Sequence, residues 1–124
     1  MSMKLHTHIK LTADLIKKIT ALFPVITYKV NSTLFYEGQI PISGYLLIDG
    51  TIQITNKKKM KQILNPGTLL GVQELMLKKP SNISAEVFPN TEICYLDKTT
   101  LNNLCNEDDS DLAQFLIEHL KDVV

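Results

Sequence analysis

The segment LLGVQELMLKKPSNISAEV, residues 69–87, contains the residue types of a loop that holds a phosphate. Gly71 and the carboxylate of Glu74 precede a short polar stretch, and Ser84 and Ala85 then open a predicted strand. A phosphate bound inside a protein usually pairs with an arginine, whose planar guanidinium grips phosphate oxygens in a bidentate manner. The whole chain contains no arginine, so the segment predicts either a ligand pocket or only its shell.

Catalytic and metal-binding arrangements are not apparent in this sequence. The three histidines, His6, His8 and His119, lie outside the predicted strands, so a metal-dependent β-barrel enzyme is not expected. No Ser-His-Asp or Cys-His pairing can be recognised, and we expect a protein that is not an enzyme. Cys94 and Cys105 are predicted to be free thiols, as in proteins of a reducing compartment.

Composition indicates one soluble domain spanning residues 1–124. The 13 basic and 13 acidic residues balance, so nothing in the net charge draws the chain toward nucleic acid or an anionic membrane. All apolar runs are too short to span a bilayer, and the N-terminus lacks a signal-peptide pattern. We therefore expect a cytoplasmic protein that binds neither nucleic acid nor membrane.

Periodicity predicts a helix at about residues 12–23, with Thr12 as its N-cap, followed by a mainly β region at about residues 25–96. Short runs rich in Val, Ile, Thr, Tyr and Phe alternate there with turn residues, which is typical of an all-β sandwich or barrel. Asp49-Gly50 is a strong hairpin signal. Helical patterns return at about residues 97–124, with Asp97 capping the first helix and Asp109 or Ser110 capping the second.

This layout resembles the cyclic-nucleotide-binding domain family, whose fold is a jelly-roll β-roll flanked by helices. The resemblance covers roughly residues 12–120 and lies in the order of several weak motifs: an extended strand and Tyr-x-Glu-Gly turn, Ile-Asp-Gly-x-Ile across a hairpin, LNPGTLLG before the cassette, and EICYLDKTTLNNL after the last strand. It implies a ligand site in which a short helix offers its N–H groups to a cyclic phosphate.

The family's cassette reads Gly-Glu-Leu, about eight residues, then Arg, Ser or Ala, Ala, x and Val. Glu74 and Leu75 match its beginning, and Ser84, Ala85 and Val87 match its end. Gln73 stands where the glycine should be, unless the loop is longer and Gly71 serves. Ile83 stands in the position of the arginine that would pair with the phosphate, whereas Glu74 would take the ribose 2′-hydroxyl.

The absence of arginine predicts weak binding of cAMP or cGMP. A charge-assisted hydrogen bond contributes roughly 1.5–3 kcal/mol, and about 1.4 kcal/mol corresponds to tenfold in affinity. We therefore expect no bound cofactor and a non-enzymatic regulatory or scaffolding module that acts through protein contacts. The alternatives are a working sensor of cAMP, cGMP or a less charged ligand, and a sensory domain of a larger transcription factor or signalling protein.

Two features could contact a protein partner. The last helix carries an apolar stripe that includes Leu112, Phe115, Leu116 and Leu120. This stripe could pack on its own barrel or pair with a second copy in a homodimer. The turn around Lys57, Lys58 and Lys59 is basic and contains no aromatic residue. It could be a solvated turn, or it could contact an acidic protein partner or a membrane surface.

Overall fold

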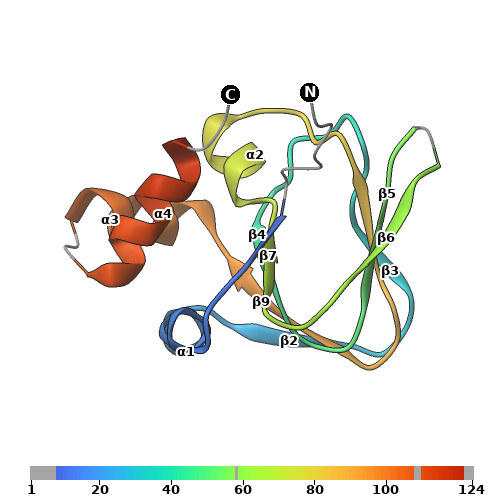
Figure 1. Cartoon of the computed structure of the whole chain (residues 1–124), viewed down its shortest axis with the longest axis horizontal. Helices are drawn as coiled ribbons and strands as arrows, with labels where there is room; N and C mark the ends of the chain where they lie inside the picture. Colours follow the sequence, from blue (N-terminus) through green and yellow to red (C-terminus); the bar gives the residue numbers. More distant parts are fainter. Residues whose placement is uncertain (1–7, 58, 108–109, 122–124) are drawn as a thin grey trace.

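The computed structural model describes residues 8–57, 59–107 and 110–121, and for Glu107 and Lys121 it describes the backbone alone. In these described residues, nine strands form two antiparallel sheets that curve into a β-roll, and four helices flank it (Figure 1). The predicted mainly β fold with flanking helices is therefore confirmed. The strands are β1 (His8–Lys10), β2 (Val25–Tyr28), β3 (Ser32–Phe35), β4 (Gly44–Asp49), β5 (Ile52–Thr55), β6 (Lys61–Leu64), β7 (Thr68–Leu70), β8 (Ser84–Val87) and β9 (Thr91–Leu96). The helices are α1 (Ala13–Leu22), α2 (Val72–Leu77), α3 (Lys98–Glu107) and α4 (Asp111–Lys121).

The strand order is β1-β7-β4-β9-β2 in one sheet and β3-β8-β5-β6 in the other. Strand β1 was not predicted, because its three residues carry no strand pattern of their own. It forms by pairing with β7, with His8 opposite Leu70 and Lys10 opposite Thr68. This pairing joins segments far apart in the sequence, so periodicity could not reveal it.

The hairpin predicted at Asp49-Gly50 is not formed, because β4 and β5 belong to different sheets and the turn between them passes from one sheet to the other. The geometry of this turn nevertheless requires glycine. Gly50 has a φ of +96°, a left-handed conformation that other residues adopt with strain. A Cβ at this position would lie 2.3 Å from Oγ1 of Thr91. The Thr91 hydroxyl accepts a hydrogen bond from the backbone N–H of Thr51, at 3.0 Å, and so binds the turn to β9.

Helix starts follow the predicted caps. The Thr12 hydroxyl accepts from the N–H of Leu15 at 3.3 Å, and the Asp97 carboxylate accepts from the N–H of Thr100 at 3.0 Å. The Ser110 hydroxyl accepts from the N–H of Ala113 at 3.1 Å. Each bond satisfies a donor that the first turn of a helix leaves free, so local sequence is sufficient to start these helices.

The buried side chains form two groups. The helical group fills the space between the β4 sheet and the helices, and includes Leu46, Leu69, Val72, Leu75, Leu112 and Leu116. The roll interior holds a second group, which includes Phe35, Tyr45, Ile54, Ile83, Ala85 and Ile93. Within the described part of the chain, no helix is long and apolar enough to cross a membrane.

Candidate functional site

Gly71 forms the turn from β7 into α2. Its φ is +84°, and an added Cβ would lie 3.2 Å from the carbonyl oxygen of Ser43. The carbonyl of Gly71 accepts from the N–H of Leu75 at 3.0 Å, so the glycine starts the helix without a side-chain cap. The cassette motif did not decide whether Gly71 or Gln73 stands at the position of its glycine. In the structure, Gly71 makes the sharp turn.

Gln73 bonds to the C-terminal helix. Its side-chain Nε2 donates to the carbonyl oxygen of His119 at 2.6 Å, and both residues are buried. The rings of His119 and Phe115 stack within α4, with centroids 5.9 Å apart. The side chain of Gln73, which stands where the cassette usually has glycine, therefore connects α2 to α4. The sequence did not predict this contact, because it joins residues 46 positions apart.

Glu74 is buried with one oxygen unsatisfied. Its side chain is only 7% exposed, and Oε1 has no hydrogen-bond partner among the described residues. Burial raises the pKa of this carboxyl, while a backbone hydrogen bond and the charge of Lys79 oppose that rise. A buried carboxylate oxygen without a donor is unusual and marks a position where a proton or a ligand hydroxyl would be stabilised.

Ile83 lies in the roll interior. Its side chain is fully buried, in the same apolar group as Phe35 and Tyr45. The rings of Phe35 and Tyr45 stack with centroids 5.9 Å apart, and Tyr45 also meets Tyr95 edge-on at 5.2 Å. The position aligned with the family's arginine is therefore part of an apolar, aromatic core.

The other predicted site residues have structural roles. Leu75 belongs to the helical group, whereas Ala85 is fully buried in the roll interior. The hydroxyl of Ser84 accepts from the N–H of Glu37 at 2.9 Å, which fixes the loop after β3. The structure thus divides the predicted cassette between two packing groups.

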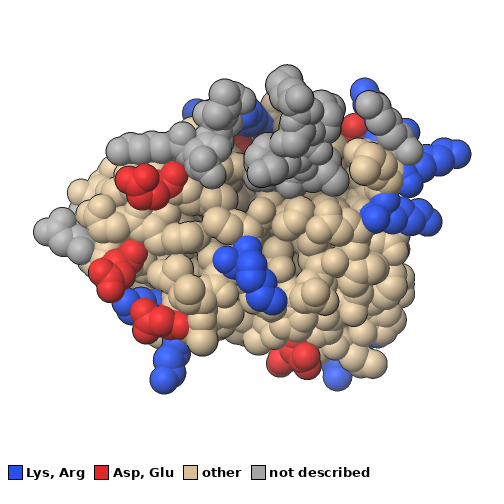
Figure 2. Space-filling model, in the orientation of Figure 1, with Lys and Arg blue, Asp and Glu red and all other residues tan. Residues whose placement is uncertain are grey.

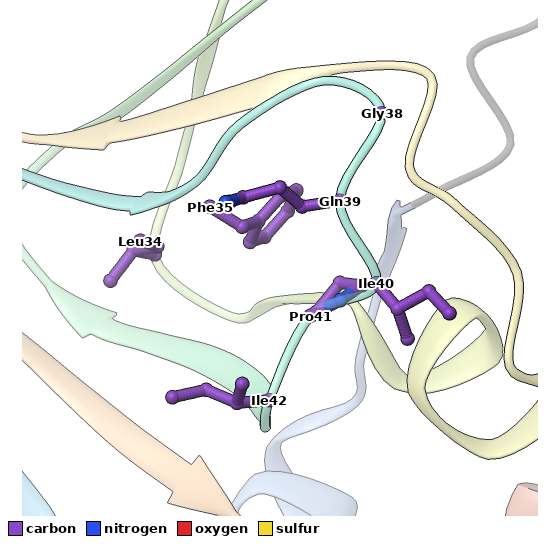
Figure 3. A pocket seen from close by; sticks show the side chains of 7 residues that line it. All are labelled: Leu34, Phe35, Gly38, Gln39, Ile40, Pro41 and Ile42. Atoms are coloured by element: carbon purple, nitrogen blue, oxygen red, sulfur yellow. The ribbon is translucent and has the colours of Figure 1, made fainter.

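The structure also contains a pocket that the sequence did not predict, next to the cassette residue Ser81, which bonds to Gly38 and Gln39. It has a volume of about 620 Å³ and lies between the end of β3 and the β3–β4 loop (Figure 3). Its lining residues are Leu34, Phe35, Gly38, Gln39, Ile40, Pro41 and Ile42. The sequence shows that this loop is rich in apolar residues, but their spacing does not predict that they surround a pocket.

The predicted contact residues of the last helix pack largely against the chain itself. Leu112 and Leu116 are buried in the helical group, and Phe115 and Leu120 are partly buried against it. Leu112 and Leu116 are therefore not exposed to a partner, which agrees with the alternative that the helix packs on its own barrel. Lys57 and Lys59 are exposed at the turn between β5 and β6, and Lys58 lies outside the described residues.

The described residues contain no group of three or more His, Cys, Asp or Glu side chains that could hold a metal ion. Both cysteines are free, as predicted: Cys94 is buried in β9, and Cys105 is half-buried near the end of α3. Burial raises the pKa of the Cys94 thiol to about 11, so this thiol is protonated and unreactive at neutral pH.

The sequence model of the cyclic nucleotide-binding domain family matches residues 25–108. The chain belongs to the cyclic nucleotide-binding domain family. The predicted resemblance is thus confirmed, and the matched residues include strands β2 to β9, the cassette segment and α3. No curated protein matches the chain.

Solved structures share the fold of this cyclic nucleotide-binding domain. One, from work on a cyclic-GMP-dependent signalling pathway that regulates bacterial phytopathogenesis, has a TM-score of 0.77 at 18% identity, covering 90% of this chain and 93% of the other. The Thermus thermophilus catabolite activator protein has a TM-score of 0.67 at 21% identity, covering 90% and 54%. Oxidized CprK in complex with o-chlorophenolacetic acid has a TM-score of 0.57 at 19% identity, covering 89% and 46%. The chain thus spans about half the length of the last two.

Proposed function

We propose that this chain is a non-enzymatic regulatory or scaffolding domain that acts through protein contacts and does not bind cAMP or cGMP tightly. Family members are typically regulatory sensors rather than enzymes, which supports the regulatory part. The observation that carries the rest is the burial of Ile83 in the apolar roll interior, at the position aligned with the phosphate-pairing arginine. A cyclic phosphate placed there would lose its hydration without gaining a counter-charge.

Calorimetric titration with cAMP and with cGMP tests this proposal. We expect no saturable binding at ligand concentrations up to about 100 μM, because a missing charge-assisted bond weakens a micromolar site by more than tenfold. A dissociation constant at or below about 10 μM for either nucleotide would contradict the proposal.

Ile83→Arg, with Ile83→Val as its control, separates two reasons for weak binding. In an apolar interior, an arginine without a partner should lower the free energy of unfolding by several kcal/mol, whereas Ile83→Val should cost about 0.5–1.5 kcal/mol. Urea denaturation measures both. If Ile83→Arg folds with near wild-type stability and binds cAMP, the cassette is intact apart from its arginine, and the missing charge rather than the apolar packing explains the weak binding of wild type.

A small-ligand sensor is the second candidate, and the unsatisfied Oε1 of Glu74 favours it. A neutral or weakly charged ligand needs no arginine, and CprK, which shares the fold, is known in complex with an arylacetic acid. Heat release on titration with o-chlorophenolacetic acid or with a neutral nucleoside, lost in Glu74→Ala, would favour this function. If the chain is one domain of a longer protein, either function would serve that protein's regulation.

A further inference from the structure

The loop between β3 and β4, residues 36–43, presents apolar side chains to solvent around the 620 Å³ pocket. Tyr36 is 59% exposed, Ile40 46% and Ile42 84%. Phe35 and Pro41 line the pocket and are themselves buried. Figure 3 shows Pro41 between Ile40 and Ile42 along the loop, with the side chains of Phe35 and Gln39 close to each other. A concave apolar hollow with exposed branched side chains at its edge suits the side chain of another molecule.

Hydrogen bonds hold this loop in place without a partner. The N–H of Gly38 donates to the carbonyl of Ser81, and the N–H of Ser81 donates to the carbonyl of Gln39, each at 2.7 Å. The side chain of Gln39 accepts from the N–H of Tyr36 at 2.9 Å. The buried hydroxyl of Ser81 in turn bonds to both backbone groups of Ile83, at 2.8 and 3.1 Å. Since the loop is already fixed, binding there would lose little conformational entropy.

The surroundings of the pocket are basic. Gly38 also lines a second hollow of about 530 Å³, together with Glu37, Lys57, Ser81 and Asn82. The described charged residues of segments 36–43, 56–61 and 78–82 are five lysines and one glutamate: Lys57, Lys59, Lys61, Lys78, Lys79 and Glu37. Lysine side chains gather at the upper right of Figure 2, over the tip of the β5–β6 hairpin of Figure 1.

We propose that the β3–β4 loop and its pocket bind an acidic peptide segment of a partner protein. An apolar side chain of the segment would enter the pocket between Ile40 and Ile42. Its flanking carboxylates would face the lysines, of which Lys57 lines the adjoining hollow. Opposite charges across the edge of an interface raise association rates and exclude wrong partners, while the buried apolar anchor supplies most of the affinity.

An anionic membrane would also attract the lysines, but the shape favours a peptide. Membrane-inserting side chains project outward from a convex surface, whereas Phe35 and Pro41 line a hollow that accepts a side chain. This inference rests on the proposed function, because it names the surface through which the protein contacts would form.

Selection from a displayed library of random 12-residue peptides on the whole chain tests the inference. We expect enriched peptides to carry a large apolar residue flanked by Asp or Glu. A synthetic copy of an enriched peptide is then titrated, by fluorescence polarisation, into wild type and variants. Ile40→Ser should weaken binding by about tenfold, or about 1.4 kcal/mol, since it removes an apolar side chain of the pocket against which the anchor would pack.

Ile26→Ser is the matched control for Ile40→Ser. Ile26 is 45% exposed, almost as much as Ile40, but it lies on β2 at the bottom of Figure 1. It should leave the affinity within about twofold. Lys57→Glu should weaken binding and reduce its salt dependence, whereas Lys29→Glu, at the β2–β3 connection, should not. Thermal unfolding verifies that all four surface variants are folded.

Three results would overturn the inference: no enrichment, enriched peptides without an acidic and apolar character, or equal loss in Ile40→Ser and Ile26→Ser. Binding to phosphatidylserine vesicles that Ile40→Ser abolishes, without peptide binding, would assign the surface to a membrane instead. None of these outcomes bears on cyclic-nucleotide affinity. Failure of this surface is therefore distinguishable from failure of the proposed function, which calorimetry decides.

Discussion

Ile83 and Glu74 are both buried, but burial has opposite consequences for the two side chains. The apolar side chain of Ile83 gains free energy from leaving water and contributes to the roll interior. The carboxylate of Glu74 loses hydration, and its Oε1 has no compensating donor among the described residues. At the scale of single residues, the position aligned with the family's arginine is therefore packed among apolar side chains, whereas Glu74 keeps one unsatisfied polar atom.

Replacing Glu74 by Gln tests the cost of this buried carboxylate. Because burial raises the pKa of Glu74 above its usual 4.5, the folded chain binds more protons than the unfolded chain over the interval above that value. Wild-type stability should therefore fall as pH rises through the folded-state pKa. Glu74→Gln removes the ionisation, so we expect it to be more stable than wild type at pH 7–8, by about 1 kcal/mol or a few degrees in Tm.

Melting curves of both proteins between pH 4 and pH 8 provide the measurement. The gap in Tm should narrow toward pH 4, where the wild-type carboxyl is protonated. Glu86→Gln, at an exposed position on β8, is the control. Its Tm should stay close to that of wild type at each pH. A Glu74→Gln variant that is less stable than wild type at every pH would show that the charged carboxylate is satisfied after all.

At the scale of elements, α2 is held between the roll and α4. The Gln73–His119 bond joins α2 to α4, and Val72 and Leu75 of α2 share an apolar group with Leu112 and Leu116 of α4. Lys18 of α1 also contacts Asp111 at 3.5 Å, although both side chains are exposed enough for this pair to contribute little. Buried contacts, including those with α2, thus contribute more to the position of α4 than this ion pair does.

Gln73→Ala should loosen this connection. The change removes a buried donor and leaves the carbonyl of His119 without that bond, so we expect a loss of about 1–3 kcal/mol in the free energy of unfolding. Gln114→Ala is the matched control, because Gln114 lies on α4 and is exposed. Its effect should stay within about 0.5 kcal/mol in the same urea titrations. Equal stabilities of the two variants would mean that the α2–α4 bond contributes nothing.

At the scale of the whole molecule, α4 completes the core of its own chain. Leu116 is fully buried together with Leu46 of β4 and Leu69 of β7, so the helix covers the outer face of that sheet (Figure 1). Hydrophobic residues buried within one chain stabilise that chain whether or not another copy is present. The predicted homodimer would have to use the parts of α4 that remain exposed.

The unfolding midpoint should therefore be independent of protein concentration. A dimer whose core depended on α4 of a second copy would gain stability by mass action as concentration rises. Melting curves over a hundredfold range of concentration, with sedimentation equilibrium at the highest one, give the measurement. A rising midpoint together with a dimeric mass would show that the helices are shared between copies.

Much of the fold is encoded locally. Alternating apolar residues and turn residues predicted eight of the nine strands, and the capping side chains of Thr12, Asp97 and Ser110 predicted three helix starts. The strand that was not predicted, β1, has too few residues to show a periodic pattern, and it forms by pairing with β7. Periodicity and capping act between near neighbours, so they can be read from sequence, whereas long-range pairing cannot.

The sequence by itself determined the resemblance to the family and the presence of isoleucine at position 83, where the family's cassette has arginine, because residue identity and order decide these. Only the tertiary structure decided what these residues contact. Ile83 packs in an aromatic interior, Gln73 bonds to α4, and Leu112 and Leu116 are buried rather than presented to a partner. It also brought the β3–β4 loop beside the lysine-rich turns. These contacts join residues distant in sequence, and burial is a property of the whole packed chain.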